Sequence, residues 1–343
     1  MAASPSDEVA AALGGMLARR SGSSGEVRGL QRLTAGGTKA TWSFDWAVPG
    51  APPQPLILQQ TPPLGAAAGQ VPKLSGPQEA ALMQAARAAG TPAPVVEAVL
   101  APEDGLGEGY VTRRVAGETL GRRILRDEAF AAARTRMAGQ CGEILATIHR
   151  TPTGGLTFLQ AFTPAQELAA YRALLDGCGV RHAALDHAVA WIGRHLPPPV
   201  PPALVHADFR TGNLVVGPEG VRCVLDWEIA RIGDPMQDLG VLCMRTWRFG
   251  GPGEVGGFGA REALYAAYES ASGQAVDPRR VRFWEAFANL KWAIACARRG
   301  SQKRPDGRPA SLELAAIGRR MEEPLWDFLY LVAPLKSALG MVQ

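Results

Sequence analysis

The spacing of four polar residues around short apolar strands constrains this chain most. An apolar run ends at Val205, and His206, Asp208, Asn213 and Asp226 follow it in that order. Between the last two, two runs rich in β-branched residues flank a Gly-Pro-Glu-Gly segment, which predicts a β-hairpin. Because a hairpin returns the chain to the edge from which it started, Asp226 should emerge beside Asn213.

The residue types at these four positions favour phosphoryl transfer. Carboxylate and amide oxygens are hard ligands that suit Mg²⁺, and divalent cations shield the phosphate oxygens while an acceptor hydroxyl is held in line. Enzymes of the kinase fold use the pattern H-x-D-x-x-x-x-N, with a second Asp on the next hairpin, for this purpose. Any one of these residues alone could cap a turn or end a strand, but four in register indicate a site.

Three linked motifs carry a resemblance to a known family. They are Val205-His-Ala-Asp-Phe-Arg-Thr-Gly-Asn-Leu214, Leu225-Asp-Trp-Glu228 and Gly233-Asp-Pro-Met-Gln-Asp-Leu-Gly240. With them, the chain resembles the aminoglycoside phosphotransferase-like (choline kinase-type) small-molecule kinases over roughly residues 28–300. It is most similar to the branch that includes the kinase-like domain of acyl-CoA dehydrogenase fusion proteins.

The resemblance implies an α+β, bilobal protein-kinase-like fold, with an antiparallel β N-lobe and a mostly helical C-lobe. We expect an N-terminal helix and linker over residues 1–25 and a nucleotide-binding N-lobe over residues 26–115. The helical C-lobe, with the catalytic loop and the acceptor pocket, should occupy residues 116–343. By the same resemblance Asp208 is the catalytic base, and Asn213 and Asp226 hold Mg²⁺.

Four other motif residues are expected to support that loop. His206 should hold it through a hydrogen bond rather than take part in the chemistry, and Asp234 and Asp238 should brace it. Arg210 either touches phosphate or ties the loop to one of those two Asp residues. Ala207 stands where the family usually has Gly. Protein kinases have Arg there to bind a phosphorylated activation loop, and they have Asp-Phe-Gly in place of Asp226-Trp-Glu, so a regulated protein kinase is not expected.

A glycine turn in the N-terminal part is predicted to cover the nucleotide phosphates. Residues 27–33 and 41–48 are predicted strands around Thr34-Ala-Gly-Gly-Thr-Lys39, and a strand–glycine–strand unit presents backbone N–H groups to phosphate. In this turn Gly36, Gly37, Thr38 and Lys39 are the candidate nucleotide-binding residues. Taken alone, Gly-Gly is also an ordinary hairpin turn.

The cation that the family places on its third strand is missing here. The helix predicted over residues 77–89 carries Glu79, whose family partner is a Lys or Arg, but the strand ends in Gln59-Gln60. Three explanations stay open: the enzyme tolerates Gln59, Lys39 reaches the phosphates instead, or the protein binds nucleotide without turnover. For Lys39, an exposed hairpin lysine is slightly preferred over a ligand.

The remaining expectations concern the hinge and the helical part. Strands over 95–100 and 110–115 should lead, through Arg113, Val115 and residues 116–119, into a hinge against the nucleotide base. Helices are predicted over residues 136–149, 259–270, 278–299 and 312–332. We expect Lys291 to be exposed. The basic segment 298–308 is either a solvated loop or a clamp for an anionic acceptor.

Composition limits the partners. A net charge of +4 over 343 residues is too small to indicate a nucleic-acid-binding protein. Five scattered Cys residues without a C-x-x-C pair, no signal-like N-terminus and no long apolar stretch predict a cytoplasmic protein without a membrane anchor. We expect a monomer or homodimer that uses ATP or GTP with Mg²⁺ to phosphorylate a small hydroxylated metabolite. The alternatives are a non-catalytic nucleotide-binding module and a kinase of aminoglycosides, choline or sugars.

Overall fold

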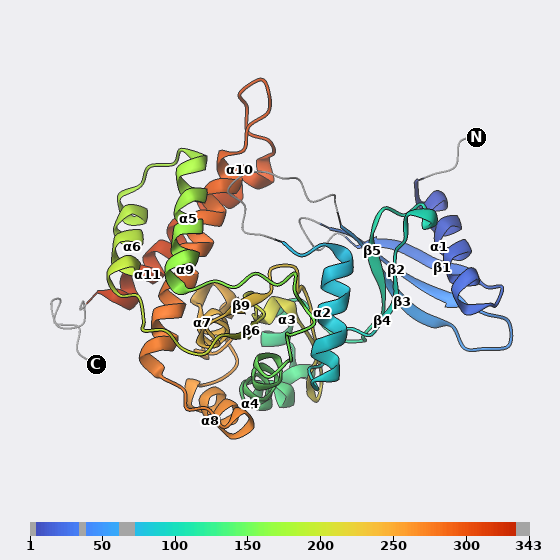
Figure 1. Cartoon of the computed structure of the whole chain (residues 1–343), viewed down its shortest axis with the longest axis horizontal. Coiled ribbons are helices and arrows are strands. Elements are labelled where there is room, and N and C mark those ends of the chain that lie inside the picture. The colour runs from blue at the N-terminus through green and yellow to red at the C-terminus, as the bar shows by residue number, and fades with distance from the viewer. Residues whose placement is uncertain (1–4, 34–38, 62–72, 334–343) are drawn as a thin grey trace.

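The computed structural model describes residues 5–33, 39–61 and 73–333, and it has two lobes (Figure 1). Gly36, Gly37 and Thr38 therefore lie outside the described residues. The N-lobe is a five-stranded antiparallel sheet in the order β1-β2-β3-β5-β4. Its strands are β1 (Glu26–Leu33), β2 (Ala40–Ala47), β3 (Gln54–Thr61), β4 (Val96–Val99) and β5 (Glu108–Arg113).

Two helices cover this sheet. Helix α1 (Pro5–Ser21) buries Leu13 and Met16 against the alternating residues of β2, of which Phe44 is fully buried. Helix α2 (Gly76–Ala88) lies between the sheet and the second lobe (Figure 1). Ser75 begins α2 with a capping box, which fixes the start of the helix that carries Glu79.

The C-lobe is mostly helical. Its helices are α3 (Gly121–Arg126), α4 (Ala131–His149), α5 (Pro164–Cys178), α6 (Ala183–Arg194), α7 (Met236–Cys243), α8 (Arg261–Ser272), α9 (Pro278–Ser301), α10 (Leu312–Arg319) and α11 (Glu322–Val332). Helix α9 packs against α5, α6, α7, α10 and α11, so that most of its length is buried. The predicted α+β bilobal fold is confirmed.

Two small antiparallel ladders in the C-lobe carry the polar motifs. Strand β6 (Ala203–Val205) pairs with β9 (Arg231–Gly233), and β7 (Leu214–Gly217) pairs with β8 (Gly220–Val224) as the predicted hairpin. Because Leu225 N–H donates to Asn213 O at 2.8 Å, the residues that flank the hairpin are also held together.

The prediction of one helix over residues 312–332 is wrong. The chain forms α10 and α11, separated by Arg320 and Met321. Pro324 has no N–H to donate to the carbonyl of Arg320, and its ring would clash with that carbonyl in a continuous helix. Over the described residues, none of the helices has both the length and the apolar character needed to cross a bilayer.

Candidate active site

Asp208 lies on the loop between β6 and β7, and its carboxylate has two side-chain partners from the same loop. Arg210 Nε donates to both carboxylate oxygens at 3.0 and 3.1 Å, and Asn213 Nδ2 donates to Oδ2 at 2.7 Å. Burial raises the pKa of Asp208, although the charge of Arg210 opposes this. The expectation that Arg210 ties the loop to Asp234 or Asp238 is wrong, because its carboxylate partner is Asp208.

Asp238 braces the start of the Asp208 loop from α7, as predicted. Its carboxylate accepts the N–H of His206 at 2.8 Å and the N–H of Ala207 at 2.7 Å, and His149 Nε2 contacts the same group at 3.1 Å. Burial alone would raise the pKa of Asp238, but the hydrogen bond from His149 and the neighbouring donors hold it below its usual value.

Asp234 has a different role from Asp238. Its Oδ2 accepts Arg280 Nε and Trp284 Nε1, both at 2.6 Å, so it ties the start of α7 to α9 rather than touching the loop. Because α9 forms the far wall of the cavity described below, Asp234 fixes that wall relative to the Asp208 loop.

His206 holds the loop with both ring nitrogens, as expected. Nδ1 accepts the N–H of Asp208 at 3.3 Å, and Nε2 donates to the carbonyl of Leu225 at 3.0 Å. This pattern requires the neutral ring with its proton on Nε2. The ring is fully buried, and burial lowers its pKa.

Two non-glycine residues of the site adopt left-handed backbone conformations. They are Ala207, with φ of 66°, and Asp226, with φ of 65°. This conformation is unfavourable for residues with a Cβ, and such strain often occurs at functional sites. Ala207 replaces Gly at a position where Gly would be unstrained.

Asn213 and Asp226 bring oxygen donors to one place. Asn213 Nδ2 donates to the backbone oxygen and to a carboxylate oxygen of Asp208, so Oδ1 of Asn213 points away from that carboxylate. The Asp226 side chain is 38% exposed and lines the same cavity as Asn213. Among the described residues there is no group of three or more His, Cys, Asp or Glu side chains that could hold a metal ion. One carboxylate and one amide fit Mg²⁺, which commonly takes one or two protein ligands together with substrate phosphates.

Lys39, just before β2, is buried against acidic residues. Its Nζ lies 2.9 and 2.8 Å from the two carboxylate oxygens of Glu79, and 3.4 Å from both Asp226 Oδ1 and Glu228 Oε2. Only 8% of its side chain is exposed, so the preferred expectation of an exposed hairpin lysine is wrong. The three carboxylates raise the pKa of Lys39 and outweigh burial, which would lower it.

The two glutamines of β3 face different surroundings. Gln59 lines the cavity and contacts the hydroxyl of Tyr110, whereas Gln60 bonds Trp42 Nε1 at 2.9 Å and the carbonyl of Leu106 at 2.8 Å. Gln59 therefore occupies the strand position that faces the site, and Lys39 supplies the charge opposite Glu79.

A cavity of about 820 Å³ runs from the N-lobe sheet to α9 and contains these residues. Lys39, Asp208, Asn213 and Asp226 all line it. The predicted hinge residues Arg113 and Val115 line it as well, whereas Glu79 lies behind Lys39 and is not a lining residue.

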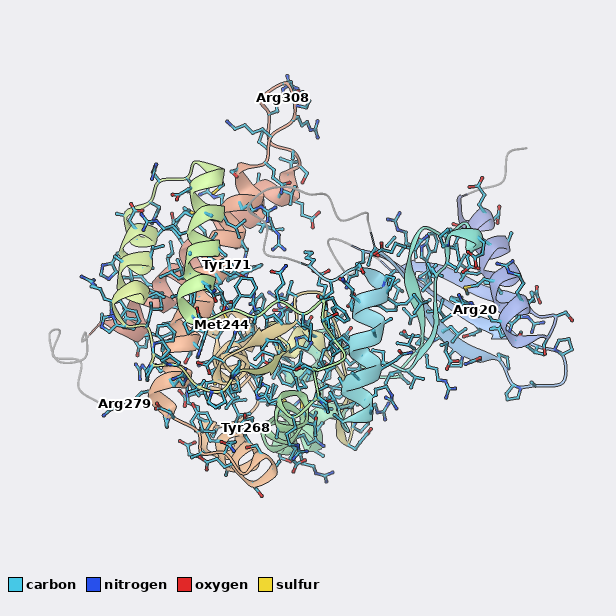
Figure 2. The ribbon with its side chains drawn as sticks, viewed as in Figure 1. Arg20, Tyr171, Met244, Tyr268, Arg279 and Arg308 are labelled. Atoms are coloured by element: carbon cyan, nitrogen blue, oxygen red, sulfur yellow. The ribbon has the colours of Figure 1, made fainter. Side chains whose placement is uncertain are left out.

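Several lining residues on the C-lobe side were not singled out from the sequence. Tyr171 on α5 and Met244 after α7, both labelled in Figure 2, line the cavity together with Trp247. Arg210 lies 4.4 Å above the ring of Trp247, which joins this wall to the Asp208 loop. This contact could not be predicted, because nothing in the local sequence fixes which way Trp247 points.

The expectation about Lys291 on α9 is wrong. Lys291 is buried, not exposed, because its Nζ donates to Glu167 Oε1 and Gln237 Oε1, each at 2.9 Å. Lys291 lies on the side of α9 that lines the cavity, and Glu167 compensates its charge. The basic segment is divided: Arg298 and Arg299 end α9 and line the cavity, while Arg308 lies on a loop that projects away (Figure 2).

Comparison with curated proteins finds a short, related segment. Over 63 residues the chain is 41% identical to acyl-CoA dehydrogenase family member 10 of Mus musculus. The aligned segment covers 18% of this chain and 6% of that protein. The similarity therefore concerns a small part of a much longer relative.

Solved structures share the fold over nearly the whole chain. A provisionally assigned aminoglycoside phosphotransferase of Ralstonia eutropha JMP134 has a TM-score of 0.67 and 21% identity, covering 93% of this chain and 98% of its own. A choline/ethanolamine kinase family protein of Mesorhizobium loti has a TM-score of 0.60 and 21% identity, covering 90% of each chain. The aminoglycoside phosphotransferase APH(4)-Ia, in a ternary complex with AMP-PNP and hygromycin B, has a TM-score of 0.59 and 16% identity, covering 94% of this chain and 99% of its own.

The family is established by a match that spans most of the chain. The model of the phosphotransferase enzyme family matches residues 37–284 of the 343 residues. The matched range contains the Lys39–Glu79 pair, the Asp208 loop and Asp226. The chain belongs to the phosphotransferase enzyme family.

Proposed function

We propose that this protein transfers the γ-phosphate of ATP or GTP to a hydroxyl group of a small, anionic metabolite in a Mg²⁺-dependent reaction. The observation that carries the proposal is the meeting of Lys39, Asp208, Asn213 and Asp226 at one cavity. These side chains come from both lobes, and together they supply a cation, a base and oxygen ligands. This is the set that phosphoryl transfer requires.

Asp208 is proposed to orient the acceptor hydroxyl and to accept its proton. Its side chain is 25% exposed in the cavity, and the bonds from Arg210 and Asn213 fix its direction. The raised pKa of Asp208, caused first by burial, increases its basicity. Because little covalent chemistry falls to the protein, positioning of this group is its main contribution.

Asn213 and Asp226 are proposed to hold Mg²⁺. When bound, the cation would neutralise charge on the phosphate oxygens. The Asn213 amide is fixed by its hydrogen bond to Asp208, and Asp226 lies at the cavity wall in a left-handed conformation. Because Asn213 Nδ2 bonds the Asp208 carboxylate, the proposed base and one proposed metal ligand hold each other in place.

The N-lobe side of the cavity is proposed to bind the nucleotide. Lys39, held by Glu79, would contact phosphate oxygens. Gly36, Gly37 and Thr38, which precede it in the sequence, are proposed from the sequence alone to bind phosphate as well. Gln59 and the hinge residues Arg113 and Val115 would contact the rest of the nucleotide. The complex of the related APH(4)-Ia fold with AMP-PNP supports a nucleoside triphosphate as co-substrate.

The acceptor is proposed to carry negative charge. On the C-lobe side the cavity presents Arg298 and Arg299, and among the described residues its acidic lining consists of Asp208, Asp226 and Glu228. All three acids are at the proposed phosphate end, so no acidic wall is left for a polycationic acceptor. A hydroxyacyl thioester of coenzyme A, whose phosphate groups carry negative charge, is one suitable acceptor, in line with the acyl-CoA dehydrogenase relative.

A metabolite-panel screen tests the proposed function. Purified protein is incubated with ATP or GTP, Mg²⁺ and hydroxylated metabolites, and release of ADP or GDP is measured with and without chelator. We expect Mg²⁺-dependent release with an anionic acceptor, lost in Asp208→Asn. Tight nucleotide binding without turnover across a broad panel would instead identify a non-catalytic nucleotide-binding module.

A further inference from the structure

A second cavity, of about 540 Å³, lies on the C-lobe beside the first. Three segments build it: helix α3, the 3₁₀ turn Arg245–Arg248 with the following Phe249, and helix α11 together with the residue Arg320. Trp247 lines both cavities.

The wall of this second cavity carries excess positive charge. Four arginines line it, Arg122, Arg126, Arg245 and Arg320, against two acids, Glu323 and Asp327. Arg320 pairs with Glu323 at 2.9 Å, and Arg245 approaches Asp327 to 3.9 Å. The acids are thus already associated with two of the arginines, and the other two remain.

Arg122 and Arg126 lie four residues apart on α3, so they project from one face of that helix. Within the described part of the chain neither side chain has a carboxylate partner or a hydrogen bond. Like charges at this spacing destabilise a helix rather than stabilise it. Arg123, between them, shows the contrast, because it pairs with Glu118 at 2.8 Å and with Asp127 at 3.1 Å.

Other groups in the wall also lack partners or carry strain. The hydroxyl oxygen of Thr246 is buried and has no hydrogen-bond partner among the described residues. Phe249 has φ of 46°, a strained value for a residue with a Cβ. Two unpaired guanidinium groups in one wall indicate a place for an oxygen-rich anion, and the rings of Trp247 and Phe249 add an apolar surface.

The second cavity is linked to the proposed base through two contacts. The guanidinium of Arg210 lies 4.4 Å from the centre of the Trp247 ring, and Arg210 Nε donates to Asp208 at 3.0 Å. A ligand that fixes Trp247 from the second cavity would therefore steady the Arg210–Asp208 pair in the first.

We propose that this cavity binds an organic phosphate, with the phosphate on Arg122 and Arg126 and the apolar part against Trp247 and Phe249. Guanidinium groups suit phosphate because they offer planar, paired donors with a permanent charge. The phosphate belongs either to a separate effector or to a remote part of the acceptor molecule. This inference concerns a second site and does not depend on turnover at the first.

Calorimetric titration with inorganic phosphate and phenyl phosphate tests the site. The full chain is used in the presence of saturating AMP-PNP and Mg²⁺, so that phosphate positions in the first cavity are filled. We expect phenyl phosphate to bind more tightly than inorganic phosphate, and Arg122→Gln and Arg126→Gln each to weaken binding about tenfold. Arg123→Gln removes the same charge from the same helix and should leave the affinity unchanged.

Kinetics then separate the two sources of the phosphate. If it belongs to an effector, phenyl phosphate changes the turnover rate and the Arg126→Gln variant loses this response. If it belongs to the acceptor, Arg126→Gln raises the acceptor KM at unchanged kcat and phenyl phosphate competes. Equal affinity for phenyl phosphate in the wild type, Arg122→Gln and Arg126→Gln would overturn the proposal, and this binding result stands whether or not the proposed transferase activity is found.

Discussion

The ammonium group of Lys39 lies 2.8 and 2.9 Å from the two carboxylate oxygens of Glu79, although the two residues come from different elements of the N-lobe. Lys39 precedes β2, whereas the strand position that faces the site on β3 is Gln59. Trp227 N–H also donates to Glu79 Oε1 at 3.2 Å, which ties the pair to the segment that follows Asp226. The pair therefore links the charge of the N-lobe to the C-lobe segment that carries Asp226.

Replacing Lys39 with Met should greatly reduce phosphoryl transfer. Met keeps much of the volume but removes the only Lys charge that contacts both Glu79 and Asp226 in the described structure. Loss of one preorganised charge that stabilises the transition state costs about 10²–10³ in rate. The measurement is kcat/KM for nucleotide, with circular dichroism melting to show that the variant is folded.

Moving the charge back to β3 supplies the control. Gln59→Lys places an ammonium group on the strand that faces the same cavity, so Lys39→Met/Gln59→Lys should recover a substantial part of the activity. The single Gln59→Lys variant tests whether a second cation is tolerated. Unchanged nucleotide Kd and kcat in Lys39→Met would mean that Lys39 has only a structural role.

The sequence predicted the half of the site that is built from short-range structure. Asp208, Asn213 and Asp226 belong to one supersecondary unit, formed by β6, the following loop and the β7–β8 hairpin. Their spacing in the sequence is therefore sufficient to predict that they lie close together. Lys39 and Lys291 were misjudged for the opposite reason. Each is buried by acidic residues far away in the chain, Glu79 in one case and Glu167 in the other, and no local pattern reports such a pairing.

The C-terminal region shows the same limit. Helical periodicity predicted α9 well, but it could not reveal that Arg298 and Arg299 would face the cavity while Arg308 projects away on a loop. The break between α10 and α11 was accessible in principle, because Pro324 signals it, but a helix can also accommodate Pro in its first turn. Pro324 lies in the first turn of α11, so the break comes just before it.

Ala207→Gly should stabilise the protein. At φ of 66°, Ala pays about 1–2 kcal/mol for the left-handed conformation, whereas Gly adopts it freely but loses about 0.4–1 kcal/mol through greater freedom of the unfolded chain. We expect a net gain of about 0.5–1 kcal/mol in the free energy of unfolding, measured by urea titration. Ala266→Gly, on the exposed face of α8, is the matched control and should lose about the same amount. A loss in both variants would show that Ala207 is not strained.

Substitution of Arg210 should move the acid side of the activity profile. Burial raises the pKa of Asp208, and the charge of Arg210 lowers it. If the base must be ionised, activity falls as pH drops through this pKa. Arg210→Met removes the opposing charge, so the pKa rises further and the loss of kcat/KM should begin at a higher pH than in the wild type.

Arg210→Lys separates charge from geometry. Arg210 bonds both Asp208 oxygens while its planar guanidinium stacks on Trp247. Lys keeps the positive charge but has no planar group for this stacking. We therefore expect a smaller shift of the acid limb than in Arg210→Met, together with a kcat reduced about tenfold. Identical acid limbs in all three proteins would show that Arg210 does not govern the ionisation of Asp208.

His206 should make the folded state sensitive to mild acid. Burial lowers its pKa because it disfavours the charged ring. The neutral ring also accepts the Asp208 N–H on Nδ1, a bond that protonation of this nitrogen would break. In the unfolded chain the ring protonates near its ordinary pKa of about 6.5. Below that pH the ring binds a proton in the unfolded state but not in the folded state. The free energy of unfolding therefore falls as the pH drops, by no more than about 1.4 kcal/mol per pH unit for this group. Urea unfolding between neutral pH and about pH 5.5 should show a shallower decline for His206→Gln, which is less stable overall but has no ring to protonate. His195→Gln, at an exposed position, should keep the wild-type slope, and the same slope in all three proteins would refute this role for His206.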